Sequence, residues 1–410
     1  MDFLISIGKV FATQLAAALP YVFYSLPLFI IFFTWKTWID YVQEHYIKNI
    51  DWVLLEIKIP KEITKPPEAM ELFLIVLNQS KEGTFIERWF KGFVPAWFSL
   101  EVASFSGDVH FYIRTPRDYK KIIEDNIYSQ YSEIEIVEKT EDYADNTDYF
   151  DRPEKWGIWA GEYKLTKDDY YPIKTYLDYN LKGSSEKSDS NVDPLTPFLE
   201  TFGSLLPGEQ MWSQILVRTS LKRFRKPGSW FKKVDWKYAA KKELDKLQKR
   251  DKVIKEGEFP NPGEFTQTPQ EKFAAEAISR SLTKTGFDCG WRVAYLAPVE
   301  TFNKGNIAAL IGSTKHFNSA ELNGFAPKKK VGFEYPWQDM TGKRTKRIKW
   351  ELLDSYRKRS YFYAPYTRPL FVLTTEELAT IYRFPGSVAA TPTLGRIESK
   401  RSDPPANLPV

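Results

Sequence analysis

The side chains with the clearest chemical potential are the basic and aromatic residues that interleave between Ser220 and Arg250. From Arg218 to Lys255 there are fifteen lysines and arginines against four acidic residues. Cations attract phosphates and aromatic rings stack on bases, so this composition suits contact with nucleic acid. It also suits docking on anionic lipid, or a solvated helix whose rings pack on the protein body. The residues that would contact nucleic acid or lipid are Arg223, Arg225, Trp230, Lys232, Lys233, Lys241 and Lys242.

A second basic stretch runs from Lys328 to Arg359, with eleven basic residues against four acidic ones. It leaves the same three interpretations open. Between the two halves of the chain, an acidic run from Glu141 to Asp151 lacks the glycine and closing glutamate of a calcium loop, so it reads as a solvated linker.

No other pattern points to chemistry. The three histidines, His45, His110 and His316, do not fall at metal-ligand spacing, and the single Cys289 cannot form an intrachain disulfide. A nucleophile elbow is absent, and Gly312 to Lys315 has the wrong order for a phosphate-binding loop. We therefore predict no catalytic, cofactor-binding or metal site, and a protein that is not an enzyme.

The elements that would position these residues begin with an alternating strand at Trp52 to Pro60. A helix follows Pro66 and Pro67, a hairpin spans Trp97 to Thr115, a helix carries Tyr119 to Tyr131, and Glu133 to Lys139 is a strand. The order β-α-β-β-α-β predicts a ferredoxin-like, split βαβ unit over residues 51–140.

Residues 173–375 look like a decorated copy of that unit, separated from it by the acidic linker 141–172. We expect strands at Ile173 to Tyr179, Met211 to Thr219, Gly290 to Ala297 and Leu370 to Leu373, with a helix from Asn303 to Phe317. Residues 220–286 form a basic helical insertion, in which Thr268 to Glu271 is a capping box. Residues 376–410 are a C-terminal helix and a Pro-rich tail. The predicted fold class is α+β, with two such units.

Residues 1–50 are expected to anchor the chain in a membrane. Leu15 to Trp35 is an uncharged stretch of about the length that crosses a bilayer, and its Pro20 and Pro27 are better tolerated in a spanning helix than in a soluble one. Lys36, Lys48, Lys58 and Lys61 follow it, so the rule that positive residues stay inside predicts a single-pass protein with a cytoplasmic body.

The segment Phe371 to Val410 contains Thr375-Glu376-Glu377-Leu378-Ala379 and Phe384-Pro385. It resembles the segment that precedes the motor domain of HerA/FtsK-superfamily ATPases of conjugation and type IV secretion. The N-terminal part, with LLEIKIPKEITKPPEAMELFL and FSLEVASFSGDVHFYIRTP, resembles a membrane-anchored domain that accompanies such ATPases.

The resemblance implies an accessory, non-catalytic platform for a separately encoded ATPase, because no Walker motif follows the motor-adjacent segment in this sequence. Glu376, Glu377, Leu378, Phe384 and Pro385 would dock the motor. The membrane, DNA and a second copy of the chain are further candidate partners. The alternative function is that of a membrane-tethered nucleic-acid-binding protein that uses residues 220–250.

Overall fold

The computed structural model describes residues 2–60, 65–79, 81, 83–145, 148–152, 154–181, 193–225, 228–229, 232–250, 267–332 and 335–385. The chain divides into two compact units. Unit 1 consists of residues 1–50, 82–94 and 363–367, and unit 2 consists of residues 51–81, 95–362 and 368–410.

Unit 1 is built around a long helix, α1 (Asp2–Lys48), and a short one, α3 (Phe85–Trp89). The ring centroids of Trp35 and Trp89 lie 5.5 Å apart, and the indole nitrogen of Trp38 donates to the backbone oxygen of Trp89 at 3.3 Å. A capping box between Thr84 and Glu87 begins α3. Aromatic stacking therefore holds the two helices of this unit together.

The predicted membrane-spanning segment is wrong. Among the described residues, no helix is both long enough and apolar enough to cross a membrane. The segment Leu15 to Trp35 lies within α1, where Tyr21, Tyr24 and Ser25 interrupt the aliphatic residues. Pro27 and Trp35 are exposed along α1, whereas the side chains of Leu15 and Pro20 fall outside the described part. The predicted single-pass localisation depends on this segment and is therefore also wrong.

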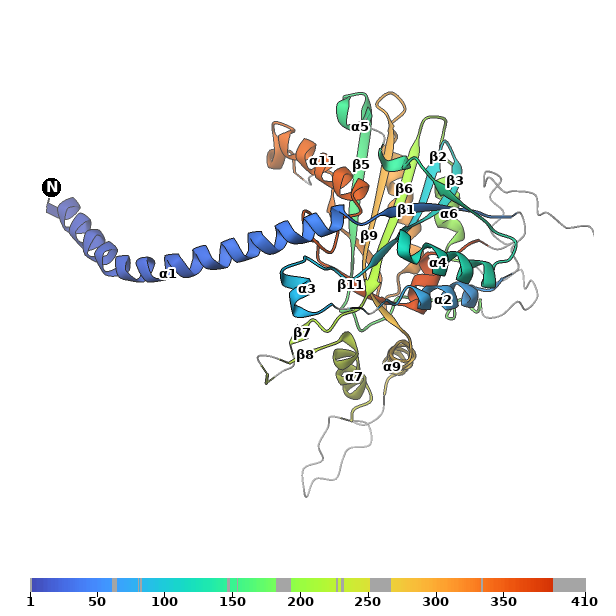
Figure 1. Cartoon of the computed structure of the whole chain (residues 1–410), viewed down its shortest axis with the longest axis horizontal. Coiled ribbons are helices and arrows are strands. Elements are labelled where there is room, and N and C mark those ends of the chain that lie inside the picture. Colours follow the sequence, from blue (N-terminus) through green and yellow to red (C-terminus); the bar gives the residue numbers. More distant parts are fainter. Residues whose placement is uncertain are drawn as a thin grey trace, which may run out of the picture. The chain divides into compact units, whose positions relative to one another are not determined.

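Unit 2 contains a nine-stranded antiparallel sheet (Figure 1). Eight strands follow the order β10-β5-β9-β6-β2-β3-β1-β4, and β11 also pairs with β9. The strands are β1 (Trp52–Lys58), β2 (Trp97–Phe105), β3 (Asp108–Pro116), β4 (Glu135–Lys139), β5 (Trp156–Leu165), β6 (Gln210–Thr219), β9 (Gly286–Pro298), β10 (Phe325–Lys330) and β11 (Phe371–Thr374). A separate ribbon pairs β7 (Phe224–Arg225) with β8 (Lys233–Val234).

The helices of unit 2 pack around this sheet. Contacts join α2 to α4 and α12, α6 to β2, β3 and α10, and α11 to β5. The longer ones are α2 (Pro67–Val76), α4 (Arg117–Gln130), α6 (Thr196–Gly203), α7 (Trp236–Leu247), α9 (Pro269–Leu282), α10 (Lys304–Thr314), α11 (Lys343–Arg357) and α12 (Thr375–Ile381). Short turns are α5 (Asp148–Asp151), η1 (Tyr143–Asp145), η2 (Lys315–Phe317) and η3 (Pro336–Asp339).

The sheet contains the same strand order twice. Along the chain, β1-α2-β2-β3-α4-β4 is followed by β5-α6-β6-β9-α10-β10, and in space the strands run β2-β3-β1-β4 and β6-β9-β5-β10. The predicted fold class is wrong in treating the halves as separate units. Strands β2 and β6 pair along their whole length, from Trp97 opposite Arg218 to Phe105 opposite Gln210. Pairing removes two sheet edges that separate units would expose.

Strand β5 lies inside the segment expected to be an acidic linker. Its sequence, WGIWAGEYKL, contains two glycines, which weaken a strand pattern. A Cβ atom at Gly157 would lie 2.3 Å from the ring of Phe302, so close packing explains one of them. Conversely, the strand expected at Ile173 to Tyr179 is a series of turns, in which the Asp178 carboxylate accepts from the Thr175 backbone nitrogen at 2.9 Å.

A buried polar network crosses the seam between β2 and β6. The Glu101 carboxylate receives two hydrogen bonds of 3.0 Å from Arg359, one of 2.6 Å from the Tyr143 hydroxyl and one of 2.8 Å from the Gln214 amide. Burial raises the pKa of Glu101, but the charge and hydrogen bonds of Arg359 outweigh it and lower the pKa to about 2. Glu101 is therefore ionised and fully paired in the centre of the sheet.

Candidate nucleic-acid interface

Helix α11 is amphipathic, and its exposed side is basic. Leu352, Leu353 and Tyr356 are buried in the main core of unit 2. Four of the exposed side chains follow i, i+3, i+4, i+7 spacing, which places them on one stripe of the helix. We call these residues the α11 basic face: Lys343, Lys346, Arg347 and Trp350.

The first turn of α11 is held in place by Asp339. Its carboxylate accepts from the backbone nitrogens of Arg344 at 3.2 Å and Thr345 at 2.7 Å, and from the Thr345 hydroxyl at 2.6 Å. These bonds lower the pKa of Asp339. Gly342 has φ of +68°, a left-handed conformation that favours glycine. The orphan amides of the first turn are thus satisfied from η3, which fixes where the basic face begins.

Two stacked aromatic residues stand directly before α11. The rings of Tyr335 and Trp337 lie 4.6 Å apart with an interplanar angle of 14°. Tyr335 is 50% exposed and Trp337 is 69% exposed, and Trp350 on α11 is 53% exposed. We call Tyr335 and Trp337 the aromatic pair. Large exposed rings near cations are the arrangement on which unpaired bases stack.

Three cations of α11 have no ion-pair partner in the described part of the chain. Lys346, Arg347 and Lys349 form no ion pair with any residue that the structure describes. By contrast, Lys329 on β10 pairs with Glu351 at 2.7 Å, which ties the sheet edge to α11. Lys328 and Lys330 on the same strand are exposed. Burial lowers the pKa of Lys349, so this amine lies in a partly desolvated position.

A cavity of about 470 Å³ opens beside the α11 basic face. It lies between α11 and β5, with Lys346, Lys349 and Trp350 on one side and Ile158 on the other. Of the α11 basic face, Lys346 and Trp350 therefore line the cavity, whereas Lys343 and Arg347 do not.

The basic stretch singled out from the sequence, Ser220 to Arg250, is differently placed. Arg223 is ion-paired with Asp288 and, at 3.0 Å, with Asp169. Trp236 is 3% exposed and packs with Ala240. Trp236 of α7 is thus used for packing. This agrees with the interpretation of the stretch as a solvated helix whose rings pack on the protein body.

The remaining predicted contacts in this stretch are scattered. Lys232 precedes β8 and Lys233 lies in it, while Lys241 and Lys242 lie on α7; all four are exposed. Arg225 belongs to β7, but its side chain lies outside the described residues, as does the whole of Trp230. Unlike the α11 basic face, these cations lie on two different elements.

The predicted docking residues lie inside unit 2. Glu376 is 3% exposed and Glu377 is 4% exposed, and Leu378, Phe384 and Pro385 are also buried. Glu376 accepts from the Thr175 hydroxyl at 2.6 Å and pairs with Arg280 at 3.0 Å. Their side chains therefore hold α12 in the core rather than face a partner.

Glu377 has a structural task in the capping box of α12. Its carboxylate accepts from the backbone nitrogens of Thr374 at 2.8 Å and Ile173 at 2.9 Å. Burial raises the pKa of Glu377 to about 7, although these hydrogen bonds act in the opposite direction.

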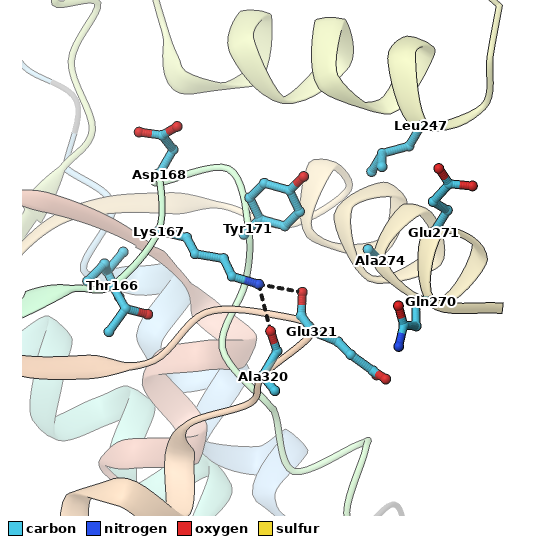
Figure 2. Close-up of a pocket in the computed structure, with 11 residues that line it drawn as sticks. Thr166, Lys167, Asp168, Tyr171, Leu247, Gln270, Glu271, Ala274, Ala320 and Glu321 are labelled. Atoms are coloured by element: carbon cyan, nitrogen blue, oxygen red, sulfur yellow. Dashed lines mark hydrogen bonds between the residues drawn. The ribbon is translucent and has the colours of Figure 1, made fainter. Parts of the chain in front are cut away.

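A second cavity, of about 840 Å³, lies between the loop after β5 and the start of α9. Figure 2 shows its one lysine, Lys167, turned toward the backbone oxygens of Ala320 and Glu321, to which it donates at 2.9 and 2.8 Å. Asp168, Glu271 and Glu321 line the same cavity. With its cation engaged and carboxylates around it, this cavity repels phosphate and does not suit nucleic acid.

The histidines and the cysteine form no further site. Within the described ranges, no group of three potential ligands could hold a metal ion. The His110 ring lies 2.8 Å from the Glu56 carboxylate and 3.1 Å from that of Asp108. Cys289 is buried in β9, and burial raises the pKa of its thiol well above the usual range, which makes it inert.

The site residues that the sequence interpretation missed are Tyr335, Trp337, Lys346, Arg347 and Trp350. The composition of Lys328 to Arg359 indicates a basic stretch but does not show which of its cations share a helix face. The i, i+3, i+4, i+7 pattern of Lys343, Lys346, Arg347 and Trp350 is readable in the sequence and would have placed all four on one face.

Comparisons with protein-family models and with curated proteins find no match to this chain. The resemblance to a domain that accompanies secretion ATPases therefore stays a prediction, and the candidate site rests on its own geometry.

Proposed function

We propose that this protein binds single-stranded nucleic acid through the α11 basic face and the aromatic pair. The observation that carries the proposal is the stacked, exposed pair Tyr335 and Trp337 beside cations that have no ion-pair partner among the described residues. Cations on a helix face attract the phosphates of any nucleic acid. Exposed rings add affinity only where bases are unpaired, which favours single strands over duplex.

The size of the electrostatic contribution follows from the number of cations. Three contacts, from Lys343, Lys346 and Arg347, correspond to a slope of about −2 in a plot of log affinity against log salt, at roughly 0.7 per phosphate for single strands. Stacking contributes about 1–3 kcal/mol per base and depends little on salt. The proposed mode of binding is therefore partly, not wholly, electrostatic.

Fluorescence anisotropy with a labelled single-stranded 12-mer tests the proposal. The expected result is binding that weakens with salt at that slope, together with weaker binding of a duplex of the same length. A single-stranded RNA 12-mer measured in parallel shows whether the affinity depends on the sugar. Equal affinity for duplex and single strand would contradict the role of the aromatic pair, and no binding at low salt would end the proposal.

The accessory role beside a separate ATPase is a second proposal, and the resemblance of the segment Phe371 to Val410 is what supports it. Because α12 belongs to the core of unit 2, deleting it would confuse docking with unfolding. The better test removes residues 386–410 and keeps α12. Loss of co-purification with a HerA-type ATPase, with unchanged thermal stability, supports the role; retained co-purification contradicts docking through that segment.

A further inference from the structure

The cavity beside the α11 basic face has the size and lining of a site for one planar ring. Its volume of about 470 Å³ falls within the range of small-ligand pockets, roughly 300–1,000 Å³. Ile158 and Leu353, each 4% exposed, give it an apolar wall. Tyr149 and Trp350 add aromatic surface. A ring that enters it is partly removed from water against these side chains, and such burial is a source of base-stacking affinity.

The charged side chains that line the cavity suit the phosphates and the base edge of a nucleotide. Lys346 and Lys349 line the side formed by α11, where the phosphates that flank an inserted base would lie. The Glu154 carboxylate, from the turn before β5, also lines the cavity and is exposed. A carboxylate accepts hydrogen bonds but cannot donate them. It therefore favours the exocyclic amine of a base such as cytosine over thymine, whose single N3–H lies between two carbonyl oxygens that repel the carboxylate.

The walls of the cavity are held in position before any ligand arrives. The Tyr149 hydroxyl donates to the Gln210 side chain at 2.9 Å, and its ring packs edge-on against Trp156 at 4.7 Å. On the opposite wall, the hydrogen bonds from Asp339 fix the first turn of α11. A preformed site loses little conformational entropy on binding.

We propose that this cavity takes up one unstacked nucleobase of a bound single strand, with Lys346 and Lys349 on the neighbouring phosphates and Glu154 selecting amino-bearing bases. The inference rests on the proposed function and adds to it a defined position for one base. The aromatic pair stacks other bases outside the cavity, so the two features are separable by mutation.

The first experiment measures the affinity of the full-length protein for a 12-mer of deoxycytidine and for an abasic 12-mer with the same backbone charge. The wild type is expected to bind the cytosine strand at least about tenfold more tightly, since one stacked base contributes roughly this factor. Ile158→Phe fills the cavity and should lower that ratio about fivefold or more while leaving the abasic affinity unchanged. Ile158→Val, which keeps the cavity open, is the control.

A second measurement does not depend on a core substitution. Glu154 is exposed, so Glu154→Ala should fold normally. The wild type is expected to prefer the deoxycytidine 12-mer to a thymidine 12-mer by about fivefold or more, since the two carbonyl oxygens of thymine repel the carboxylate that the cytosine amine would bind. In Glu154→Ala the ratio should approach one. Cytidine monophosphate distinguishes a free nucleotide from a strand, and should compete only at concentrations at least about a hundredfold higher.

Three results would overturn the inference. A cytosine-to-abasic ratio unaffected by Ile158→Phe but reduced by Trp337→Ala would place all base contacts outside the cavity and leave the proposed function intact. An unchanged cytosine-to-thymine ratio in Glu154→Ala would remove the selectivity. Equal affinity for the mononucleotide and the 12-mer would make the cavity a site for a free nucleotide. Absence of binding to both 12-mers would instead refute the proposed function itself.

Discussion

At the residue scale, Arg223 and Lys346 show why a count of charges does not locate a binding surface. Both belong to stretches rich in lysine and arginine. Arg223 is ion-paired with Asp169 and Asp288, whereas Lys346 is exposed and unpaired among the described residues. A cation already neutralised by carboxylates of its own chain offers little to a phosphate. Which carboxylates a cation meets depends on contacts far apart in the sequence, which local patterns do not encode.

The exposed Trp350 leads to a prediction at this scale. Trp350→Ala should weaken the binding of a single-stranded 12-mer by about 1–3 kcal/mol, the loss of one stacking surface, and leave the melting temperature unchanged. Anisotropy and thermal melting measure the two effects. Tyr238→Ala is the matched control, because Tyr238 is a similarly exposed ring on α7 in the other basic stretch. Equal losses in both variants would contradict the assignment to α11.

The pairing of Glu101 with Arg359 leads to a prediction about pH. In the folded protein the pKa of Glu101 is about 2, below its ordinary value of 4.5, so the unfolded chain binds more protons between these pH values. The contribution of this group to stability is therefore present above about pH 4.5 and is lost as pH falls toward 2.

Urea unfolding across this pH range tests it with Glu101→Gln. The free energy of unfolding of the variant should be lower by about 3–5 kcal/mol at neutral pH, because the substitution breaks a buried ion pair and leaves the charge of Arg359 only partly neutralised. Its stability should also fall less steeply than that of the wild type below pH 4.5. A variant as stable as the wild type at pH 7, or one with the same acid profile, would show that the network does not stabilise the fold.

At the scale of elements, α12 shows that a local pattern can specify a helix without specifying whether that helix is exposed. The phrase TEELA forms a helix with a capping box from Thr374 to Glu377. Its acidic residues suggest a surface helix, yet every residue from Thr375 to Ile381 is buried. Arg280 forms an ion pair with Glu376, and the backbone nitrogen of Ile173 donates a hydrogen bond to Glu377. Neither partner lies near α12 in the sequence.

The burial of α12 predicts that truncating one of its apolar side chains strongly lowers the stability of the fold. Leu378 is fully buried, so Leu378→Ala should lower the free energy of unfolding by about 2–5 kcal/mol, through lost burial and the cavity left behind. Leu206→Ala, at a mostly exposed position before β6, should change it by no more than about 0.5 kcal/mol. Similar values for the two variants in urea titrations would mean that α12 does not pack as described.

Strand and helix patterns were informative where side chains alternate regularly and less so elsewhere. The strands expected near Trp52, Trp97, Met211 and Gly290 lie close to β1, β2, β6 and β9. Strand β5 has no clear strand pattern because Gly157 and Gly161 break the alternation; both glycines closely approach aromatic rings, of Phe302 and Trp159 respectively. Strand β10 has none because Lys328, Lys329 and Lys330 occupy an edge of the sheet, where lysines protect against unwanted pairing.

At the scale of the whole molecule, unit 2 is one sheet with two similar halves rather than two units joined by a linker. The pairing of β2 with β6 depends on residues about a hundred positions apart, such as Glu101 and Gln214, and no local pattern specifies it. The same continuity positions the candidate site, because β5 supplies one wall of the cavity and α11 the other. The charged stretches could be found from composition, but their relation to this sheet could not.

The central claim is that the α11 basic face, not the stretch from Ser220 to Arg250, binds single-stranded nucleic acid. The most direct test compares two double variants that reverse the same amount of charge on exposed helix positions. One variant carries Lys346→Glu and Arg347→Glu on α11, and the other carries Lys241→Glu and Lys242→Glu on α7. Affinity for a single-stranded 12-mer is measured by anisotropy at two salt concentrations. The first pair should weaken binding at least about tenfold and reduce the salt slope by about 1.4, the value for two lost phosphate contacts. The second pair should change affinity less than about twofold. The reverse pattern, or equal losses in the two variants, would contradict the account.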